Sequence, residues 1–167
     1  AAALLPVLPR PLPAINTLPT PAFVTSGTWR RYVPAGHSLV SVPLAGSRNV
    51  QPMFWSARTG LDLPVARGYF LGPGPDREDA EAIFGAPKRP TSVLLDKVVA
   101  TGKVPTITAS DRANALADLR YWRGSVVVLQ PGTRNDGDLW EATSDLLGSP
   151  PVLIGGLWVW DVRALVG

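Results

Sequence analysis

The stretch GSVVVLQP, residues 124–131, decides the fold that we expect for this chain. It holds an unbroken apolar run from Val126 to Leu129, bounded by Gly124 and Pro131. A short continuous run of this kind is typical of a strand that is covered on both faces. We therefore predict a central strand here, in a sheet with a layer on each side.

Amphipathic helix patterns lie on either side of this strand. Residues 108–122 open with Thr108 and Asp111 at the spacing of a capping box, and residues 139–147 end at Gly148. Their apolar positions recur at helical spacing, which predicts two helices that each turn one side to the core. In the first helix the predicted polar side is Asp111, Asn114 and Asp118, and the predicted apolar side is Ala113, Leu116, Ala117 and Leu119.

A third helix is predicted over residues 91–102. Thr91 or Ser92 is a suitable cap, and Gly102 stands at the stop position. Its single apolar stripe consists of Leu94, Leu95, Val98 and Val99.

Two more segments have strand character. SLVSVPL, residues 38–44, is predicted as a strand that ends at Pro43, and PVLIGGLWVWDV, residues 151–162, places Gly155 and Gly156 between two apolar runs as in a hairpin. Strands that alternate with helices, followed by a hairpin, predict an α/β layered fold. We expect a mixed, mainly parallel sheet flanked by helices, with a C-terminal β-hairpin.

The second hairpin strand contains two tryptophans that a sugar-binding surface could use. In GGLWVWDVR, residues 155–163, Trp158 and Trp160 point to one face, while Leu157 and Val159 point to the other. Because both faces are apolar, the pattern favours a core strand over an exposed platform.

The region between the first strand and residue 91 is predicted from local signals. Residues 49–60 are predicted as a helix capped by Asn49, and RGYFLGPGPD, residues 67–76, as a short strand followed by a turn. Residues 77–84 are predicted as a short acidic helical turn that ends at Gly85.

The chain opens with a proline-rich segment. Six prolines between residues 1 and 28 exclude a continuous helix and predict an extended leader, so that residues 29–167 form a single α/β domain. The apolar residues 1–8 fit the end of a removed transmembrane helix and equally an extended segment that lies on the surface of the domain.

Composition narrows the classes of function. The formal net charge is +3 and no basic run is longer than Arg30–Arg31, which argues against nucleic acid as a partner. The chain has no cysteine, so thiolate chemistry and cysteine-bound metals are excluded. No run of about 18 apolar residues is present. No cofactor motif is found, and we expect no cofactor.

Two groups of residues are candidates for ligand binding. The loop after the central strand offers Arg134, Asn135 and Asp136 at the carboxyl end of a strand, where open α/β sheets bind ligands. The end of the preceding helix offers Tyr121 and Trp122, and Trp122 is our first choice for an exposed ring. The flanking charged residues are Arg120 and Arg123.

The sequence identifies no catalytic or metal-binding residue. His37 is the only histidine, it lies in a turn, and no G-x-S-x-G elbow or H-x-x-x-H spacing accompanies it. We therefore interpret His37 as a surface or capping residue. A small independent hydrolase would need His37 and a nucleophile in one pocket.

Four segments carry a resemblance to a known family. GTWRRYVPAGHSLVSVPL, FWSARTGLDLPVARGYFLGPGP, ADLRYWRGSVVVLQP and LWVWDVR resemble the C-terminal extracytoplasmic domain of actinobacterial polytopic membrane glycosyltransferases. These GT-C type proteins are similar to dolichyl-phosphate-mannose protein mannosyltransferases. The resemblance covers residues 19–163.

The resemblance implies a parent enzyme that uses a polyprenyl-phosphate sugar and whose catalytic acids lie outside this chain. We thus expect a non-catalytic accessory domain on the extracytoplasmic face of the cell membrane, as the soluble tail of a membrane protein. Its partners would be the transmembrane portion of its own parent and cell-envelope glycan. The alternative is a structural scaffold that docks on a membrane bundle or on a partner protein.

Overall fold

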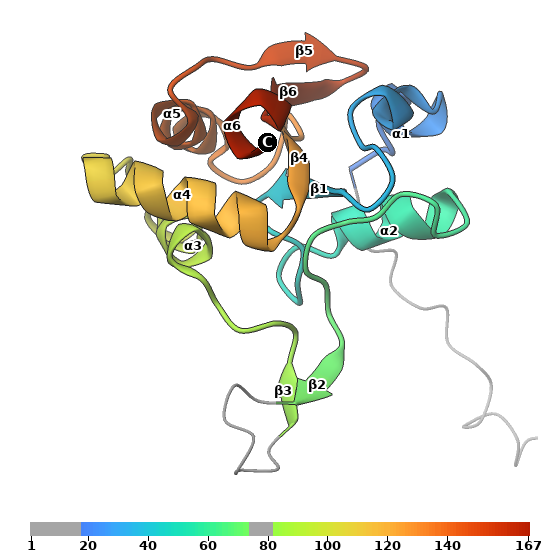
Figure 1. The fold of residues 1–167 in the computed structure, drawn as a ribbon, viewed down its shortest axis with the longest axis horizontal. Helices are drawn as coiled ribbons and strands as arrows, with labels where there is room; N and C mark the ends of the chain where they lie inside the picture. The colour runs from blue at the N-terminus through green and yellow to red at the C-terminus, as the bar shows by residue number, and fades with distance from the viewer. Residues whose placement is uncertain (1–17, 74–81) are drawn as a thin grey trace, which may run out of the picture.

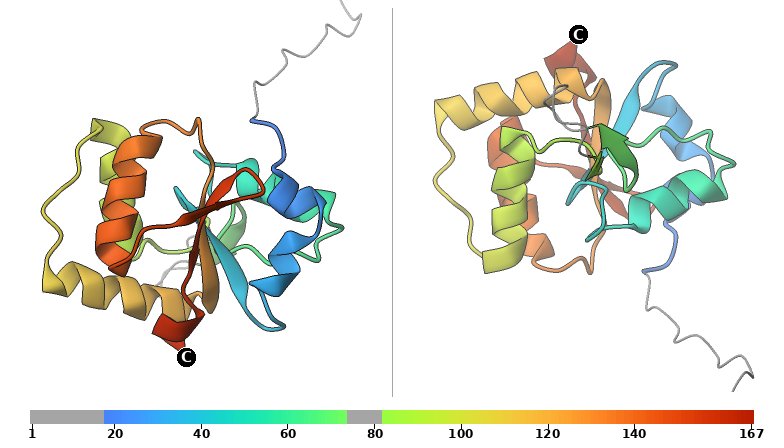
Figure 2. Two further views of the ribbon diagram at one scale, coloured as in Figure 1. Left: turned by 90° about the horizontal axis from the view of Figure 1, so that it is seen from above. Right: turned by 90° about the horizontal axis from the view of Figure 1, so that it is seen from below.

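The structure is a computed structural model, and it describes residues 18–73 and 82–167. These residues form three layers. A four-stranded sheet in the order β1-β4-β6-β5 lies between two groups of helices (Figures 1 and 2). Its strands are β1 (Ser38–Val42), β4 (Gly124–Leu129), β5 (Val152–Ile154) and β6 (Leu157–Asp161). The predicted α/β layered fold with a mixed sheet and a C-terminal hairpin is confirmed.

The helices form two unequal layers. Short elements cover one face of the sheet, namely α1 (Ala22–Thr25), η2 (Thr28–Arg31) and α2 (Gln51–Arg58). Longer helices cover the other face, namely α3 (Pro90–Thr101), α4 (Ala109–Tyr121) and α5 (Asp136–Leu147). A small ribbon of β2 (Leu71–Pro73) and β3 (Ala82–Phe84) projects from the body, and α6 (Arg163–Val166) ends the chain (Figure 1).

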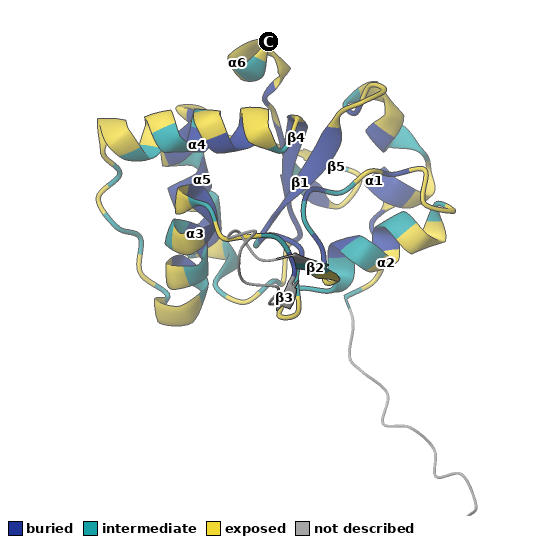
Figure 3. Ribbon diagram, turned by 60° about the horizontal axis from the view of Figure 1, so that its bottom comes forward, coloured by how far each residue is buried: buried dark blue, intermediate teal, exposed yellow. Residues whose placement is uncertain are grey.

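Strand β4 separates two hydrophobic cores. Val127 packs with the α3–α4–α5 layer, whereas Val126 and Val128 pack with the α1–η2–α2 layer. Every residue of β4 is buried, and Figure 3 shows buried residues gathered on the sheet and the inner sides of the helices. The apolar run therefore forms the covered central strand that the sequence predicts.

The sheet contains less parallel pairing than we expected. The pairing of β1 with β4 is parallel, but the pairings of β4 with β6 and of β5 with β6 are antiparallel. The hairpin turn reverses the chain between β5 and β6, and because β6 is the strand beside β4, both of its pairings are antiparallel. Beyond the outer edge of β1, Leu39 also forms an isolated parallel bridge with Val65.

The hairpin turn and its tryptophans agree with the sequence. Gly155 and Gly156 both have positive φ, at 56° and 84°, as a two-residue hairpin turn requires. Trp160 is 2% exposed. The Trp158 ring is half-buried and lies edge-on to Trp140, with the ring centroids 6.5 Å apart. The preference for a core strand is confirmed.

Several local predictions are wrong. Residues 82–84 form strand β3 and not a helical turn, and residues 77–81 lie outside the described residues. Helix α2 begins after Val50, since Asn49 uses its side chain to donate to the carbonyl of Pro43. In α4, the predicted polar residue Asp118 is buried, while Ala113 is exposed.

The domain begins earlier than residue 29. Phe23 and Val24 in α1 are 0% and 2% exposed, and the amide of Phe23 donates to the carbonyl of Gly155 at 2.8 Å. Residues 18–28 thus belong to the folded domain and are not part of an extended leader, whereas residues 1–17 lie outside the described residues. Within the described ranges, no helix combines the length and apolar character needed to cross a bilayer.

Candidate functional site

A groove lies at the carboxyl ends of the parallel strands β1 and β4. It has a volume of about 260 Å³ and is bounded by the last residues of β1, the loops that follow both strands, and the first turn of α2. Loops in this position bind ligands in many open α/β sheets. The lining residues are Leu18, Ser41, Val42, Arg48, Asn49, Val50, Gln51, Pro52, Trp55, Gln130, Gly132, Thr133 and Arg134.

Two arginines give the groove its charge. Arg48 comes from the loop after β1 and Arg134 from the loop after β4, and both side chains are exposed. Among the described residues neither arginine forms an ion pair, and the groove lining includes no carboxylate. The charged groups of the groove are therefore both cationic.

Two glutamines fix one wall of the groove to the start of the domain. Gln51 Nε2 donates to the carbonyl of Leu18 at 2.5 Å, and Gln130 Nε2 donates to the carbonyl of Pro19 at 2.7 Å. These bonds join segments that are distant in sequence. We call residues 18–19, held in this way, the strap.

Two residues that line the groove also have buried polar atoms without partners. Gln130 is 8% exposed and its Oε1 has no hydrogen-bond partner, and the indole Nε1 of Trp55, a side chain 2% exposed, has none either. A buried polar atom of this kind costs about 1–3 kcal/mol unless a partner arrives. Two residues that line the groove therefore each have one buried polar atom, an acceptor in Gln130 and a donor in Trp55, that lacks a partner.

The structure separates the three residues predicted in the loop after β4. Only Arg134 lines the groove. The carboxylate of Asp136 accepts hydrogen bonds from the amides of Gly132 and Gly137 at 2.8 and 2.9 Å, and Asn135 Nδ2 donates to the carbonyl of Val99 at 2.9 Å. Asn135 and Asp136 therefore shape the loop and fasten it to α3.

The other predicted group lies at the opposite end of β4 from the groove. The Tyr121 ring is 62% exposed, and the guanidinium of Arg89 stacks on it at 4.3 Å from the ring centroid. Arg120 donates to the carbonyl of Leu165 at 3.4 Å, and Arg123 is exposed with a φ of 52°. Since β4 runs between the two groups, no single ligand of ordinary size contacts both.

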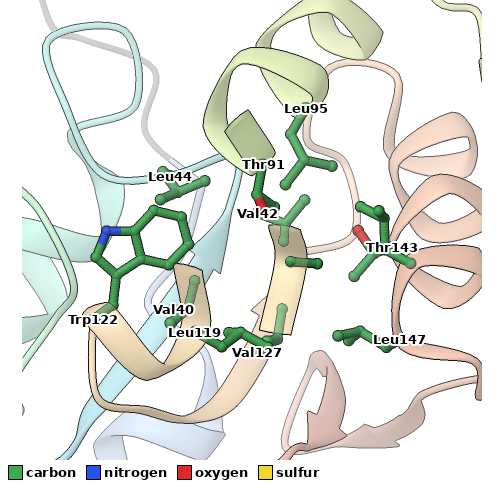
Figure 4. A pocket seen from close by; sticks show the side chains of 12 residues that line it. Val40, Val42, Leu44, Thr91, Leu95, Leu119, Trp122, Val127, Thr143 and Leu147 are labelled. Atoms are coloured by element: carbon green, nitrogen blue, oxygen red, sulfur yellow. The ribbon is translucent and has the colours of Figure 1, made fainter. Parts of the chain in front are cut away.

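Trp122 is half-buried, and its indole ring faces the interior of the protein and not the solvent. It lines an apolar cavity between the sheet and helices α3, α4 and α5 (Figure 4). The cavity offers about 20 Å³ to the centre of a water molecule, which is room for one water and not for a ligand. Thr91 and Thr143 contribute buried hydroxyls without partners to this cavity.

His37 is remote from the groove. It is exposed, precedes the amino end of β1, and its Nδ1 lies 3.2 Å from the carbonyl oxygen of Ala35. No cluster of three histidine or acidic side chains that could hold a metal ion occurs in the described part of the chain. His37 lines neither the groove nor the apolar cavity beside Trp122, so neither of these places brings it together with a nucleophile.

Sequence reasoning missed most of the groove. Arg48, Gln51 and Gln130 were not identified, although the segment from β1 to α2 and the segment from β4 to α5 share the order strand, polar loop, helix. Two such segments on parallel neighbouring strands bring their loops to the same edge of the sheet. Recognising that shared order would have indicated both walls.

Comparison of the chain with models of known protein families, with curated proteins and with solved structures finds no match.

Proposed function

We propose that this protein is a non-catalytic glycan-binding domain, and that it serves a membrane glycosyltransferase on the extracytoplasmic face of the cell membrane. The parent enzyme would use a polyprenyl-phosphate sugar donor and supply the catalytic residues. The groove at the carboxyl ends of β1 and β4 carries the proposal.

The chemistry of the groove suits a hydroxyl-rich ligand. The free Oε1 of Gln130 can accept a hydrogen bond from a sugar hydroxyl, and the side chains of Arg48 and Arg134 can donate to sugar oxygens. The glutamine bonds to the strap and the bonds of Asp136 to its own loop hold the backbone of these two walls in place before a ligand arrives.

Binding is tested by titrating the intact chain with mannan and arabinan fragments while amide chemical shifts are recorded. We expect shifts to concentrate in residues 48–52 and 130–134. Gln130→Ala should weaken binding about tenfold, and Tyr121→Ala, at the other end of β4, should leave it unchanged. Unperturbed spectra at millimolar fragment, or loss of binding in Tyr121→Ala alone, would contradict the proposal.

A second candidate function is a scaffold that docks on a membrane bundle or a partner protein. It is favoured by consecutive exposed apolar side chains that lead into the projecting ribbon: Tyr69, Phe70 and Leu71 are 51%, 49% and 66% exposed. Apolar groups gathered in this way commonly mark contact surfaces. Phe70→Ser with Leu71→Ser would then abolish co-purification with the transmembrane portion of the parent, whereas Gln130→Ala would not.

The gene sequence upstream of Ala1 tests whether the parent protein is a membrane glycosyltransferase. Many hydrophobic spans encoded upstream of Ala1 would support the glycosyltransferase parent, and a signal peptide alone would contradict it.

A further inference from the structure

We propose that the groove selects sugars that carry an oxyanion, such as a phosphate ester or a carboxylate, over neutral sugars. This inference rests on the proposed glycan-binding function and adds the class of ligand. It follows from the charges, the helix start and the unpaired polar atoms that surround one small groove.

The charge of the groove is positive on both walls. Arg48 and Arg134 approach from different loops, and in the described part of the chain no acidic side chain pairs with either. Guanidinium groups match the geometry of phosphate and carboxylate oxygens, which they can contact through two parallel hydrogen bonds. The carboxylate nearest in sequence, Asp136, is already bonded to two backbone amides.

The start of α2 adds to the positive electrostatic potential of the groove. Val50, Gln51 and Pro52 line the groove, and the first turn of this helix has neither an acidic residue nor a side-chain cap. The amino end of a helix carries partial positive charge, which favours a nearby anion. The amino end of α5 differs, because Asp136 and Asp138 already occupy its first turn.

A charged group alone does not supply a hydrogen-bond partner for every polar group of the groove-lining residues. A carboxylate or a doubly ionised phosphate ester has acceptors only, so the charged group by itself can pair with the arginines but offers no proton to the buried Oε1 of Gln130. That atom requires a donor such as a hydroxyl. A ligand that carries an oxyanion and hydroxyl groups on one small frame supplies both.

The size of the groove sets a further limit. Its volume of about 260 Å³ is below the range of about 300–1,000 Å³ that is usual for sites of drug-sized ligands. We therefore expect it to enclose one charged sugar residue, with the remainder of a longer glycan outside.

The test compares matched ligands on the intact chain by titration calorimetry: mannose, mannose 6-phosphate, glucuronate and inorganic phosphate. We expect the two charged sugars to bind at least tenfold more tightly than mannose and more tightly than phosphate. The difference should shrink as ionic strength rises from about 0.05 to about 0.5 M, because salt screens exposed charges. The phosphate and carboxylate arms identify which oxyanion is preferred.

Arginine variants locate the effect. Arg48→Gln and Arg134→Gln should each weaken binding of the charged sugars about tenfold and weaken binding of mannose much less, because glutamine keeps an N–H donor and loses only the charge. Arg58→Gln is the matched control, because it removes the same charge from the last turn of α2, outside the groove lining. Melting temperatures establish that each variant is folded.

The outcomes separate the two proposals. Equal affinity for mannose and the charged sugars, with no effect of Arg48→Gln or Arg134→Gln, overturns this inference and leaves glycan binding intact. Inorganic phosphate that binds as tightly as mannose 6-phosphate also overturns it, and so does an equal loss in Arg58→Gln. If no sugar binds, the proposed function fails together with the inference.

Discussion

The carboxylate of Asp118 accepts a hydrogen bond from Nε of Arg89 at 2.5 Å, and this bond joins the start of α3 to the last turns of α4. Asp118 is 1% exposed, and its second oxygen accepts the amide of Thr91 at 2.8 Å. The buried charge is thus paired with one cation and one amide. Through these two bonds Asp118 links α4 to the start of α3.

Asp118→Asn should therefore destabilise the protein. Removing one partner of a buried ion pair costs about 3–5 kcal/mol, and we expect about 2–3 kcal/mol here because the Arg89 side chain is 32% exposed and water can solvate it. Urea unfolding measures the change. Asp145→Asn, at an exposed position of α5, is the control, and equal losses in the two variants would contradict a special role for Asp118.

The two glycines of the hairpin turn should differ in their tolerance of alanine. Both have positive φ, which costs a non-glycine residue about 1–3 kcal/mol. A Cβ at Gly155 would also lie 2.4 Å from the backbone nitrogen of Phe23, whereas one at Gly156 meets nothing closer than 3.8 Å. We expect Gly155→Ala to lower the melting temperature well beyond Gly156→Ala. Equal effects would show that α1 shifts easily to make room for the methyl group added at Gly155.

Thr143→Val should stabilise the protein. The Thr143 hydroxyl is buried against the apolar cavity without a partner, and valine has nearly the same shape without the polar atom. Removing an unsatisfied buried group gains about 1 kcal/mol. Thermal unfolding detects this as a rise in melting temperature. A fall instead would indicate that a water molecule in the cavity bonds to the hydroxyl.

The decrease in the free energy of unfolding at acid pH, the acid limb of the curve of stability against pH, should depend on Asp161. Hydrogen bonds from Arg163 hold the pKa of the Asp161 carboxyl below its usual value of 3.8. A carboxyl whose pKa is lower in the folded state stabilises the protein fully above the usual value, and this contribution disappears as the pH falls through the folded pKa. Asp161→Asn should flatten the stability curve below about pH 4. An unchanged slope in urea titrations over that range would contradict this assignment.

Asp111 contributes to the same limb. Hydrogen bonds from the side chain and then the backbone of Thr108 lower the pKa of its carboxyl. Part of the acid sensitivity should therefore remain in Asp161→Asn and disappear when Asp111→Asn is added.

The sequence predicted those features that neighbouring residues determine. The capping box of Thr108 and Asp111 and the turn at Gly155 and Gly156 each depend on residues no more than three apart, and both are present. The unbroken apolar run of β4 likewise indicated a strand with a layer on each face.

The site depends on contacts that span the chain. The side chain of Gln130 reaches the carbonyl of Pro19, 111 residues earlier, and Arg48 meets Arg134 at the groove only because β1 and β4 are parallel neighbours. Asp118 was placed on a solvated face because helical periodicity does not reveal a partner such as Arg89, 29 residues away. Pairing of strands and partners is the information that local patterns lack.

The strap is held by an interaction that mutation of its own side chains cannot remove. Gln51 and Gln130 bind the backbone carbonyls of Leu18 and Pro19, and every amino acid has such a carbonyl. Substitutions at residues 18 and 19 can therefore occur between related proteins without loss of these two bonds. Evolutionary constraint should instead fall on the two glutamines, which makes their joint retention a better marker of this groove than the residues that they hold.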